Sequence, residues 1–359
     1  MKYFDRIGFY AGLGAAGVVF AGIYIGSRKM AHFDWALATY AVGSIFAAFA
    51  VAYRYAVWAQ RPPTLMFLKR GVQLFLQNGT SLLKTEKPAV QPVAIVKNSA
   101  TLGGALLDNF VLQRFIGKRS YERWIMHACL SWGGMLAFAI TFPLVFGWVH
   151  SETLPTDAEI YRLFFFGFQV DQFNIHSLHG FIMFNLLNLS AVLVMIGLVL
   201  AVKLRMSDKA ELAIQTFADD VVPIFILFLV TVTGMMLTVS AKFLAGHGFA
   251  FIGLAHAFSV IALLLYLPFG KLFHIFQRPA SLGVSFYKKA GAKGPQAHCH
   301  RCGAEFASQM HVDDLKTVLD ELGFDYRYVT PSGELHYQDI CPLCRRRLLA
   351  LNQGAMIGR

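Results

Sequence analysis

Six long apolar segments dominate the chain and restrict the folds that it can adopt. They cover about residues 7–26, 35–58, 124–148, 179–202, 220–242 and 250–275. Each is close to the roughly 20 residues that an α-helix needs to cross a bilayer. Charged residues make up only 15% of the 359 residues, whereas soluble domains have about 25%. The sequence therefore predicts an all-α membrane protein with about six transmembrane helices, plus a small soluble α+β module at the C-terminus.

Basic residues concentrate between the segments and predict how they are oriented. The stretch 59–123 is rich in lysine and arginine and contains short apolar patches, so we expect a basic loop with amphipathic pieces. The loop 203–212 and the residues after His274 are also basic. Six crossings place all three on one side, and the positive-inside rule then puts both termini in the cytoplasm. This topology accounts for the net charge of +11, so nucleic-acid binding is not expected.

Four regions follow from this pattern. Residues 1–58 form two N-terminal transmembrane helices, and residues 59–123 form the basic loop. Residues 124–278 form a four-helix core, and residues 295–350 form a cysteine-rich C-terminal module. Cys129 lies in a membrane segment and is expected to be a small core residue.

Two histidines of the last apolar segment carry the strongest functional signal. His256 and His274 are 18 residues apart, which is five helical turns on one face and about 27 Å along a continuous helix. An imidazole in lipid is costly unless it has a polar partner or a metal. Two of them at opposite depths suggest two metal centres, most simply haem irons, held between pairs of histidines.

The predicted topology gives each of these histidines a partner. His127 begins the third segment and pairs with His274 near the inner surface, whereas His179 pairs with His256 near the outer surface. His176 and His150 are alternative outer ligands. Any one of these residues can instead be a hydrogen-bonded packing or interface residue. Ligation by two histidines leaves no open position for oxygen and is typical of an electron carrier.

The run from His256 to Pro279, HAFSVIALLLYLPFGKLFHIFQRP, resembles the last core helix of the cytochrome b (gamma) subunit of respiratory nitrate reductases. It is also similar to related heterodisulfide-reductase-like membrane subunits. The resemblance implies that His256, His274 and His127 ligate b haems. That family has a further ligand ten residues after the first on the third segment, where this chain has Ala137. The sequence therefore leaves open whether the chain binds one haem or two.

The resemblance also implies a function. A subunit of this kind lies in the cytoplasmic membrane of a prokaryote and exchanges electrons with the quinone pool. It passes them through haem to a cytoplasmic iron–sulfur subunit and a catalytic, often molybdopterin-containing, subunit, and is not a stand-alone enzyme. His176, Asp171 and Lys242 are the candidate quinone-binding residues. A haem-free membrane anchor and a six-span transporter with a zinc-binding tail remain alternatives.

The C-terminal module contains two C-x-x-C pairs, Cys299 with Cys302 and Cys341 with Cys344. Two such pairs in a short domain predict a tetrahedral metal site, with zinc preferred and a single rubredoxin-type iron as the alternative. Between the pairs, VDDLKTVLDELGF predicts an amphipathic helix. The following DYRYVTPSGELHYQDI predicts a hairpin that turns at Pro331-Ser332-Gly333. The module resembles a zinc ribbon or a rubredoxin knuckle.

Overall fold

The computed structural model describes residues 4–76, 92–207, 209–330 and 333–357. The chain divides into two compact units. The first combines Met1–Ala56 with Leu107–Phe276, and the second combines Val57–Leu106 with Gln277–Arg359. Each unit is therefore built from two distant stretches of sequence.

The first unit is a bundle of long apolar helices. Among the described residues, six helices are long and apolar enough to cross a membrane, as the sequence predicted. Large apolar side chains cover their outer surfaces, and Phe251, Phe258 and Val18 are 77%, 76% and 73% exposed. Such surfaces are suited to lipid. The molecule is thus consistent with a multi-pass membrane protein.

The elements of this unit are, in chain order, α1 (Arg6–Gly26), η1 (Trp35–Leu37), α2 (Ala38–Ala59), η3 (Leu107–Val111), α5 (Arg114–Gly117), α6 (Tyr121–Val145), β1 (Val149–Leu154), β2 (Asp157–Phe165), β3 (Phe168–Asn174), α7 (Leu178–Ser207), α8 (Lys209–Ile214), η4 (Phe217–Val221), α9 (Val222–Phe243), α10 (Phe249–Tyr266), η5 (Lys271–Phe273) and α11 (His274–Gln277).

Small residues let neighbouring helices approach closely, as is usual in membrane bundles. Gly133 of α6 faces Ser190 and Val194 of α7, and the Ser190 hydroxyl donates to the Gly133 carbonyl oxygen at 2.8 Å. A Cβ atom at Gly133 would lie 2.7 Å from the Val194 side chain, which is too close. These contacts therefore hold α6 against α7. His127 lies near the start of α6.

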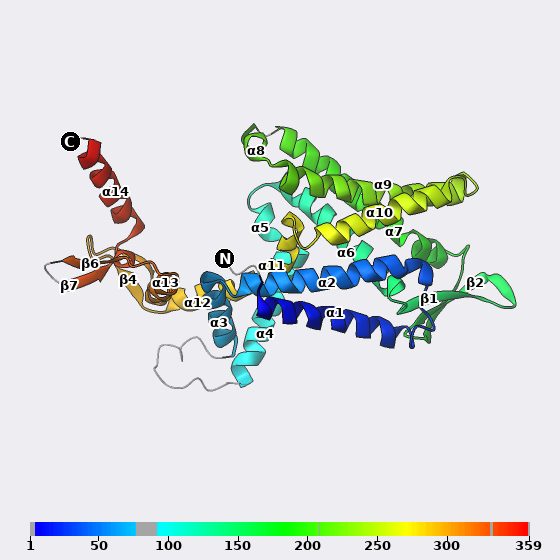
Figure 1. Cartoon of the computed structure of the whole chain (residues 1–359), viewed down its shortest axis with the longest axis horizontal. Helices are drawn as coiled ribbons and strands as arrows, with labels where there is room; N and C mark the ends of the chain where they lie inside the picture. Colours follow the sequence, from blue (N-terminus) through cyan, green and yellow to red (C-terminus); the bar gives the residue numbers. More distant parts are fainter. Residues whose placement is uncertain (1–3, 77–91, 208, 331–332, 358–359) are drawn as a thin grey trace. The chain divides into compact units, whose positions relative to one another are not determined.

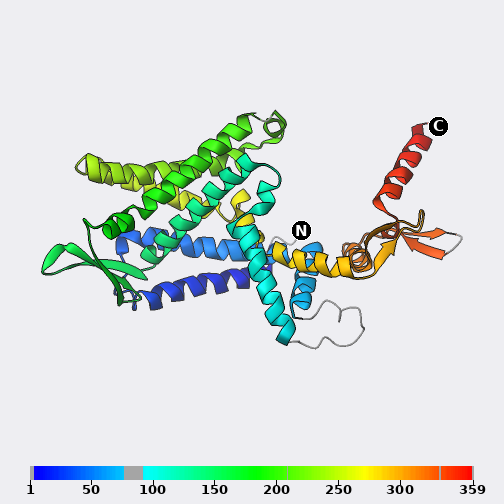
Figure 2. The ribbon, with the colours of Figure 1, turned by 180° about the vertical axis from the view of Figure 1, so that it is seen from behind.

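The segment between α6 and α7 forms a three-stranded antiparallel sheet in the order β1-β2-β3. The sequence predicts an all-α membrane part, and this sheet shows that the prediction is incomplete. Figures 1 and 2 show the sheet at one end of the bundle, called the sheet end below. Phe166 and Gly167 make the β2–β3 turn with positive φ angles of 50° and 76°, a conformation typical of tight hairpin turns.

The last predicted span, 250–275, is not one continuous helix. The helix α10 ends at Tyr266, and a turn through Pro268 and Gly270 leads to η5 and α11. Pro268 lacks the N–H that an α-helix needs, and a side chain at Gly270 would overlap the Tyr266 ring. His256 and His274 consequently lie on different helices, and the prediction that they share one face of a continuous helix is wrong.

The second unit contains α3 (Pro62–Leu76), α4 (Pro92–Leu106), α12 (Ser281–Lys293), β4 (Gln296–His298), β5 (Glu305–Ser308), α13 (Gln309–Glu321), β6 (Arg327–Thr330), β7 (Gly333–His336), η6 (Tyr337–Asp339) and α14 (Pro342–Ile357). The predicted helix between the cysteine pairs is α13, which starts at Gln309 after the N-cap Ser308. The predicted hairpin is β6–β7, although Pro331 and Ser332 of its turn lie outside the described residues.

Residues 57–106 belong to the same compact unit as the C-terminal module, whereas the sequence analysis assigned 59–123 and 295–350 to separate domains. The helix α3 packs on α12 where Gly71 meets Gly283. Leu74, Phe286 and Tyr287 form a buried cluster between these helices. Arg70 of α3 also pairs with the buried Asp314 of α13 at 2.7 Å. The ion pair between Arg70 and Asp314 and the buried apolar cluster thus join α3 to α12 and α13.

Candidate metal centres

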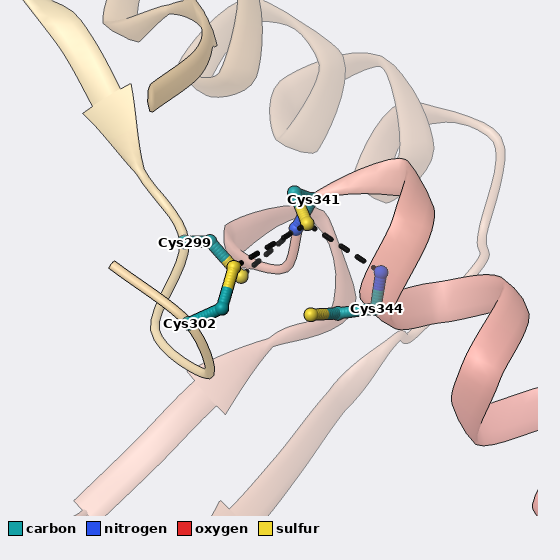
Figure 3. A group of neighbouring side chains, drawn as sticks. All are labelled: Cys299, Cys302, Cys341 and Cys344. Carbon is teal, nitrogen blue, oxygen red and sulfur yellow. Dashed lines mark hydrogen bonds between the residues drawn. The ribbon is translucent and has the colours of Figure 1, made fainter. Parts of the chain in front are cut away.

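The four cysteines of the C-terminal module come together at one point. Their sulfur atoms all lie within 4.8 Å of one another, and Figure 3 shows them converging from two segments. Cys299 and Cys302 lie in the turn between β4 and β5, and Cys341 and Cys344 lie at the start of α14. Sγ of Cys302 is 3.8 Å from Sγ of Cys341. Four sulfurs at about 2.3 Å from a tetrahedral zinc would be about 3.8 Å apart, so the group can hold a metal such as zinc or iron.

Backbone N–H groups of this site point at the sulfurs. The N–H of Cys341 donates to Sγ of Cys299 at 3.2 Å, and the N–H of Cys344 donates to Sγ of Cys341 at 3.4 Å. Burial raises the pKa of a thiol, but the backbone N–H groups of Cys341, Cys302 and Arg301, with the side chain of Cys302, lower the pKa of Cys299 to about 6. Burial raises the pKa of Cys344 to about 12. One thiolate is thus available near neutral pH for a metal to bind first, and binding displaces the protons of the others.

In the bundle, the tertiary fold brings His127, near the start of α6, next to His274, the first residue of α11. Their ring centroids are 6.4 Å apart with an interplanar angle of 64°. Two imidazoles that share a metal through nitrogens at about 2 Å would have centroids about 6 Å apart. The pair lies at the end of the bundle opposite the sheet, where α6 begins.

Hydrogen bonds determine the tautomer of both rings. Nδ1 of His127 lies 2.8 Å from Oε1 of Gln113, and Nδ1 of His274 lies 2.6 Å from the carbonyl oxygen of Lys271. Both partners are acceptors, so each Nδ1 carries the proton and each Nε2 carries a lone pair. An outer acceptor of this kind is the usual support of a metal-binding histidine.

Gln113 was not identified from the sequence. It is 4% exposed and has a positive φ of 49°. Its amide nitrogen donates to the carbonyl oxygen of Phe110 at 3.3 Å and also contacts the hydroxyl of Ser131. These two contacts turn the amide oxygen toward His127. No motif marks this residue, because it lies in a short loop before α5 that reaches His127 only through the tertiary fold.

His256 lies near the middle of the bundle and not near one surface as predicted. Its Nδ1 is 3.0 Å from the hydroxyl of Thr233, which is midway along α9. That hydroxyl donates to the Leu229 carbonyl oxygen at 2.6 Å and therefore accepts the proton of His256. His256 thus forms a hydrogen bond between α9 and α10.

The structure does not bring His179 to His256. Thr238, five residues beyond Thr233 on α9, donates to Asn188 of α7 at 2.9 Å. His179 lies nine residues before Asn188, closer to the sheet end. Nine residues on α7 plus five on α9 correspond to a difference in depth of about 21 Å. Nε2 of His179 instead contacts Asp171 at 2.8 Å. A shared haem between these two histidines does not fit this arrangement.

The alternative outer ligands are also away from His256. His150 belongs to β1 and stacks on His32 with a centroid distance of 4.2 Å, and on Phe164 at 4.9 Å. His176 lies in the turn before α7 and is 3.7 Å from Glu159. Both residues are at the sheet end, so each takes part in contacts of the sheet.

The three predicted quinone-binding residues do not form one group among the described residues. Asp171 pairs with His179, and the ammonium of Lys242 donates to Asn185 at 3.0 Å. The side chain of His176 is 74% exposed. All three lie toward the sheet end of the bundle, but each has a different neighbour.

Comparison with protein-family models, curated proteins and solved structures finds no match to this chain.

Proposed function

We propose that this protein is a membrane cytochrome of b type that carries electrons between the quinone pool and a cytoplasmic iron–sulfur partner. The single observation that supports this proposal most strongly is the approach of His127 and His274. Two helical segments, 147 residues apart in sequence, present two imidazoles at 6.4 Å with the same tautomer. A packing role would require neither feature.

The residues of the pair fit a haem. His127 and His274 would hold the iron from opposite sides through Nε2, while Gln113 and the Lys271 carbonyl hold their Nδ1 protons. A haem bound in this way supplies one-electron transfer and has no open position for oxygen. Because no other histidine among the described residues approaches His256, we propose one haem for each chain and not two.

The direction of the bundle follows from the basic loops. The His127 and His274 pair lies at the end that the positive-inside rule assigns to the cytoplasm. Electrons at this end would be close to a cytoplasmic iron–sulfur subunit, which in turn would serve a catalytic subunit of the molybdopterin class. The sheet end would face the opposite side of a prokaryotic cytoplasmic membrane, and His176, Asp171 and Lys242 there are the weaker candidates for quinone contact.

The C-terminal site would hold a structural zinc ion. A metal ion whose four ligands are protein sulfurs has no coordination position left for a substrate. The helical insert α13 between the two C-x-x-C pairs is foreign to a rubredoxin and favours zinc over a single iron. The module would then present a rigid surface to the cytoplasmic partner.

The absorption spectrum of the purified full-length protein tests the proposal. We expect a reduced-minus-oxidised difference spectrum with the α band of b haem, and a stoichiometry of one haem per chain. His274→Ala should remove this band while membrane insertion is retained. His247→Ala, which changes an exposed histidine at the sheet end, is the matched control and should leave it intact. A folded but colourless protein would contradict the proposal.

A further inference from the structure

His274 is not held by a long helix. It follows the break after α10 and is the first residue of the four-residue helix α11. A short segment of this kind does not fix a side chain by itself. The position of the His274 ring must therefore depend on contacts of the segment with its neighbours.

Lys271 makes the connecting contact. Its carbonyl oxygen accepts the Nδ1 proton of His274 at 2.6 Å, and its ammonium lies 2.6 Å from Oδ1 of Asp220. One residue thus links the histidine to a carboxylate that belongs to η4, about fifty residues earlier in the chain. The ion pair with Asp220 therefore restrains the residue whose carbonyl orients His274.

The carboxylate of Asp220 is buried and is held by several hydrogen-bond donors. Asp220 is 7% exposed, and three groups surround its carboxylate: Lys271, the guanidinium of Arg205 at 3.0 Å and the N–H of Thr216 at 3.0 Å. These donors come from η5, from the end of α7 and from the residue before η4. A buried carboxylate with two cations is costly to disrupt, because each cation would lose its partner.

The rest of the segment is held in the same place by Arg54 of α2. Its guanidinium contacts the carbonyl oxygen of Pro268 and lies 4.4 Å from the centre of the Phe273 ring. The Tyr266 hydroxyl donates to the carbonyl oxygen of Ala218 at 2.9 Å, two residues before Asp220. These contacts fix the backbone on both sides of Lys271, and Asp220 fixes Lys271 itself.

We propose that Asp220 is the positioning residue of His274. It acts through Lys271, whose carbonyl orients the imidazole so that Nε2 faces His127. The inference rests on the proposed function in one respect, namely that the metal between the two histidines is a haem iron. The positioning of the ring itself does not depend on that.

Asp220→Asn in the full-length protein tests the inference, because it removes the charge and keeps the shape and the acceptor for Thr216. We expect His127 to retain haem, whereas His274 dissociates in part of the molecules. The readouts are a high-spin electron paramagnetic resonance signal and binding of carbon monoxide, which a haem with two histidine ligands excludes. Haem affinity should fall about 10- to 100-fold, as for other outer-shell partners of metal ligands.

Asp219→Asn is the matched control, because Asp219 is the exposed neighbour and its carboxylate accepts from the Thr216 hydroxyl at 3.4 Å, whereas the ion pairs with Lys271 and Arg205 are made by Asp220. It should leave the spectra unchanged. Lys271→Gln should reproduce the effect of Asp220→Asn, and the double variant should be no worse than either single variant, since both act through one contact. Unchanged spectra in Asp220→Asn, or additive losses in the double variant, would overturn the inference.

A measurement without haem separates this inference from the proposed function. Nitrogen-15 spectra of histidine-labelled protein, with His274 assigned from His274→Gln, report its tautomer. We expect the Nδ1-protonated form in the parent protein and a mixture of tautomers in Asp220→Asn. If the protein is colourless but this change occurs, the proposed function fails and the positioning role stands. If the tautomer is unaffected by Asp220→Asn, the positioning role fails.

Discussion

The two central histidines are oriented by different kinds of acceptor. His274 uses a backbone carbonyl, which no substitution of Lys271 removes directly. His127 uses the side chain of Gln113, which is buried and has its own amide nitrogen bound to Phe110. The two imidazoles are therefore equivalent in tautomer, but only the acceptor of His127 can be deleted by a point mutation.

Gln113→Leu should weaken haem binding while leaving both histidines in place. Leucine has a similar size but no acceptor for Nδ1 of His127, so the ring can rotate and exchange tautomers. Loss of an outer acceptor lowers metal affinity by about 10- to 100-fold, and titration of haem into the apoprotein would measure this. Gln169→Leu, on the exposed part of β3, is the control. Equal affinities in the two variants would show that Gln113 does not orient His127.

At the residue scale, the sequence marks the conspicuous histidines better than it marks the residues that hold them in place. A histidine in an apolar segment is conspicuous because of its cost in lipid, so His127 and His274 could be singled out. The pairing of His256 with His179 does not fit the structure, because the hydrogen bond between Thr238 and Asn188 sets a register of α9 against α7 that places the two histidines at different depths. Gln113 and Asp220 could not be found, since neither belongs to a motif and both act only through the tertiary fold.

At the element scale, the three-stranded sheet is joined to the α1–α2 connection by a stack of rings. His150 of β1 lies between His32 and Phe164, nearly parallel to both. Arg28 donates to the carbonyl oxygen of Phe166 at 3.3 Å, and Glu152 lies 3.8 Å from Nε2 of His150. Burial is the main cause that lowers the pKa of His150 below its ordinary value of 6.5, and the neighbouring His32 and Arg28 lower it further.

We expect docking of the sheet to weaken in acid. A histidine with a lowered pKa in the docked state binds fewer protons than the same residue in a released sheet, so acidification favours release. The stabilisation is complete above the ordinary pKa of 6.5 and is lost as the pH falls from there toward the lower pKa of the docked state. Hydrogen exchange of the β1 and β2 amides, corrected for the intrinsic effect of pH, would measure the loss.

His150→Phe should remove this pH dependence, since phenylalanine preserves the stack but does not titrate. His176→Phe changes an exposed histidine at the same end and should keep the parent behaviour. If acid weakens the sheet equally in all three proteins, a group other than His150 is responsible.

At the scale of the whole molecule, some features of the fold follow from the local sequence pattern, and others form only through tertiary contacts. The length and hydrophobicity of each span are local properties, so the six helices that the described residues contain with the length and hydrophobicity to cross a membrane could be read from the sequence. The sheet at 149–174 was missed because its strands lie in a connection that hydrophobicity alone marks as a loop. The union of 57–106 with 277–359 was also missed, since it depends on Gly71, Gly283 and Arg70 meeting partners more than 200 residues away.

Asp314 of α13 connects the two stretches of sequence that form the second unit. Its carboxylate accepts from the guanidinium of Arg70 through three N–O contacts of 2.7–3.1 Å, and from the Tyr287 hydroxyl at 2.8 Å. Burial raises the pKa of Tyr287, and the bond to Asp314 raises it further, so the tyrosine remains a donor. Three helices, α3, α12 and α13, thus meet at one carboxylate.

Asp314→Asn should destabilise the second unit by about 2 kcal/mol, because hydrogen bonds to a charged group contribute about 1.5–3 kcal/mol and Arg70 is partly exposed to solvent. Thermal proteolysis of the full-length protein, followed by the appearance of fragments cut within residues 277–357, would show the loss. Asp313→Asn changes the exposed neighbour, whose carboxylate accepts from the side chain of Gln309, and should cost little. If both variants are cut at the same temperature as the parent protein, α3 does not stabilise the cysteine-rich module, and the module folds on its own contacts.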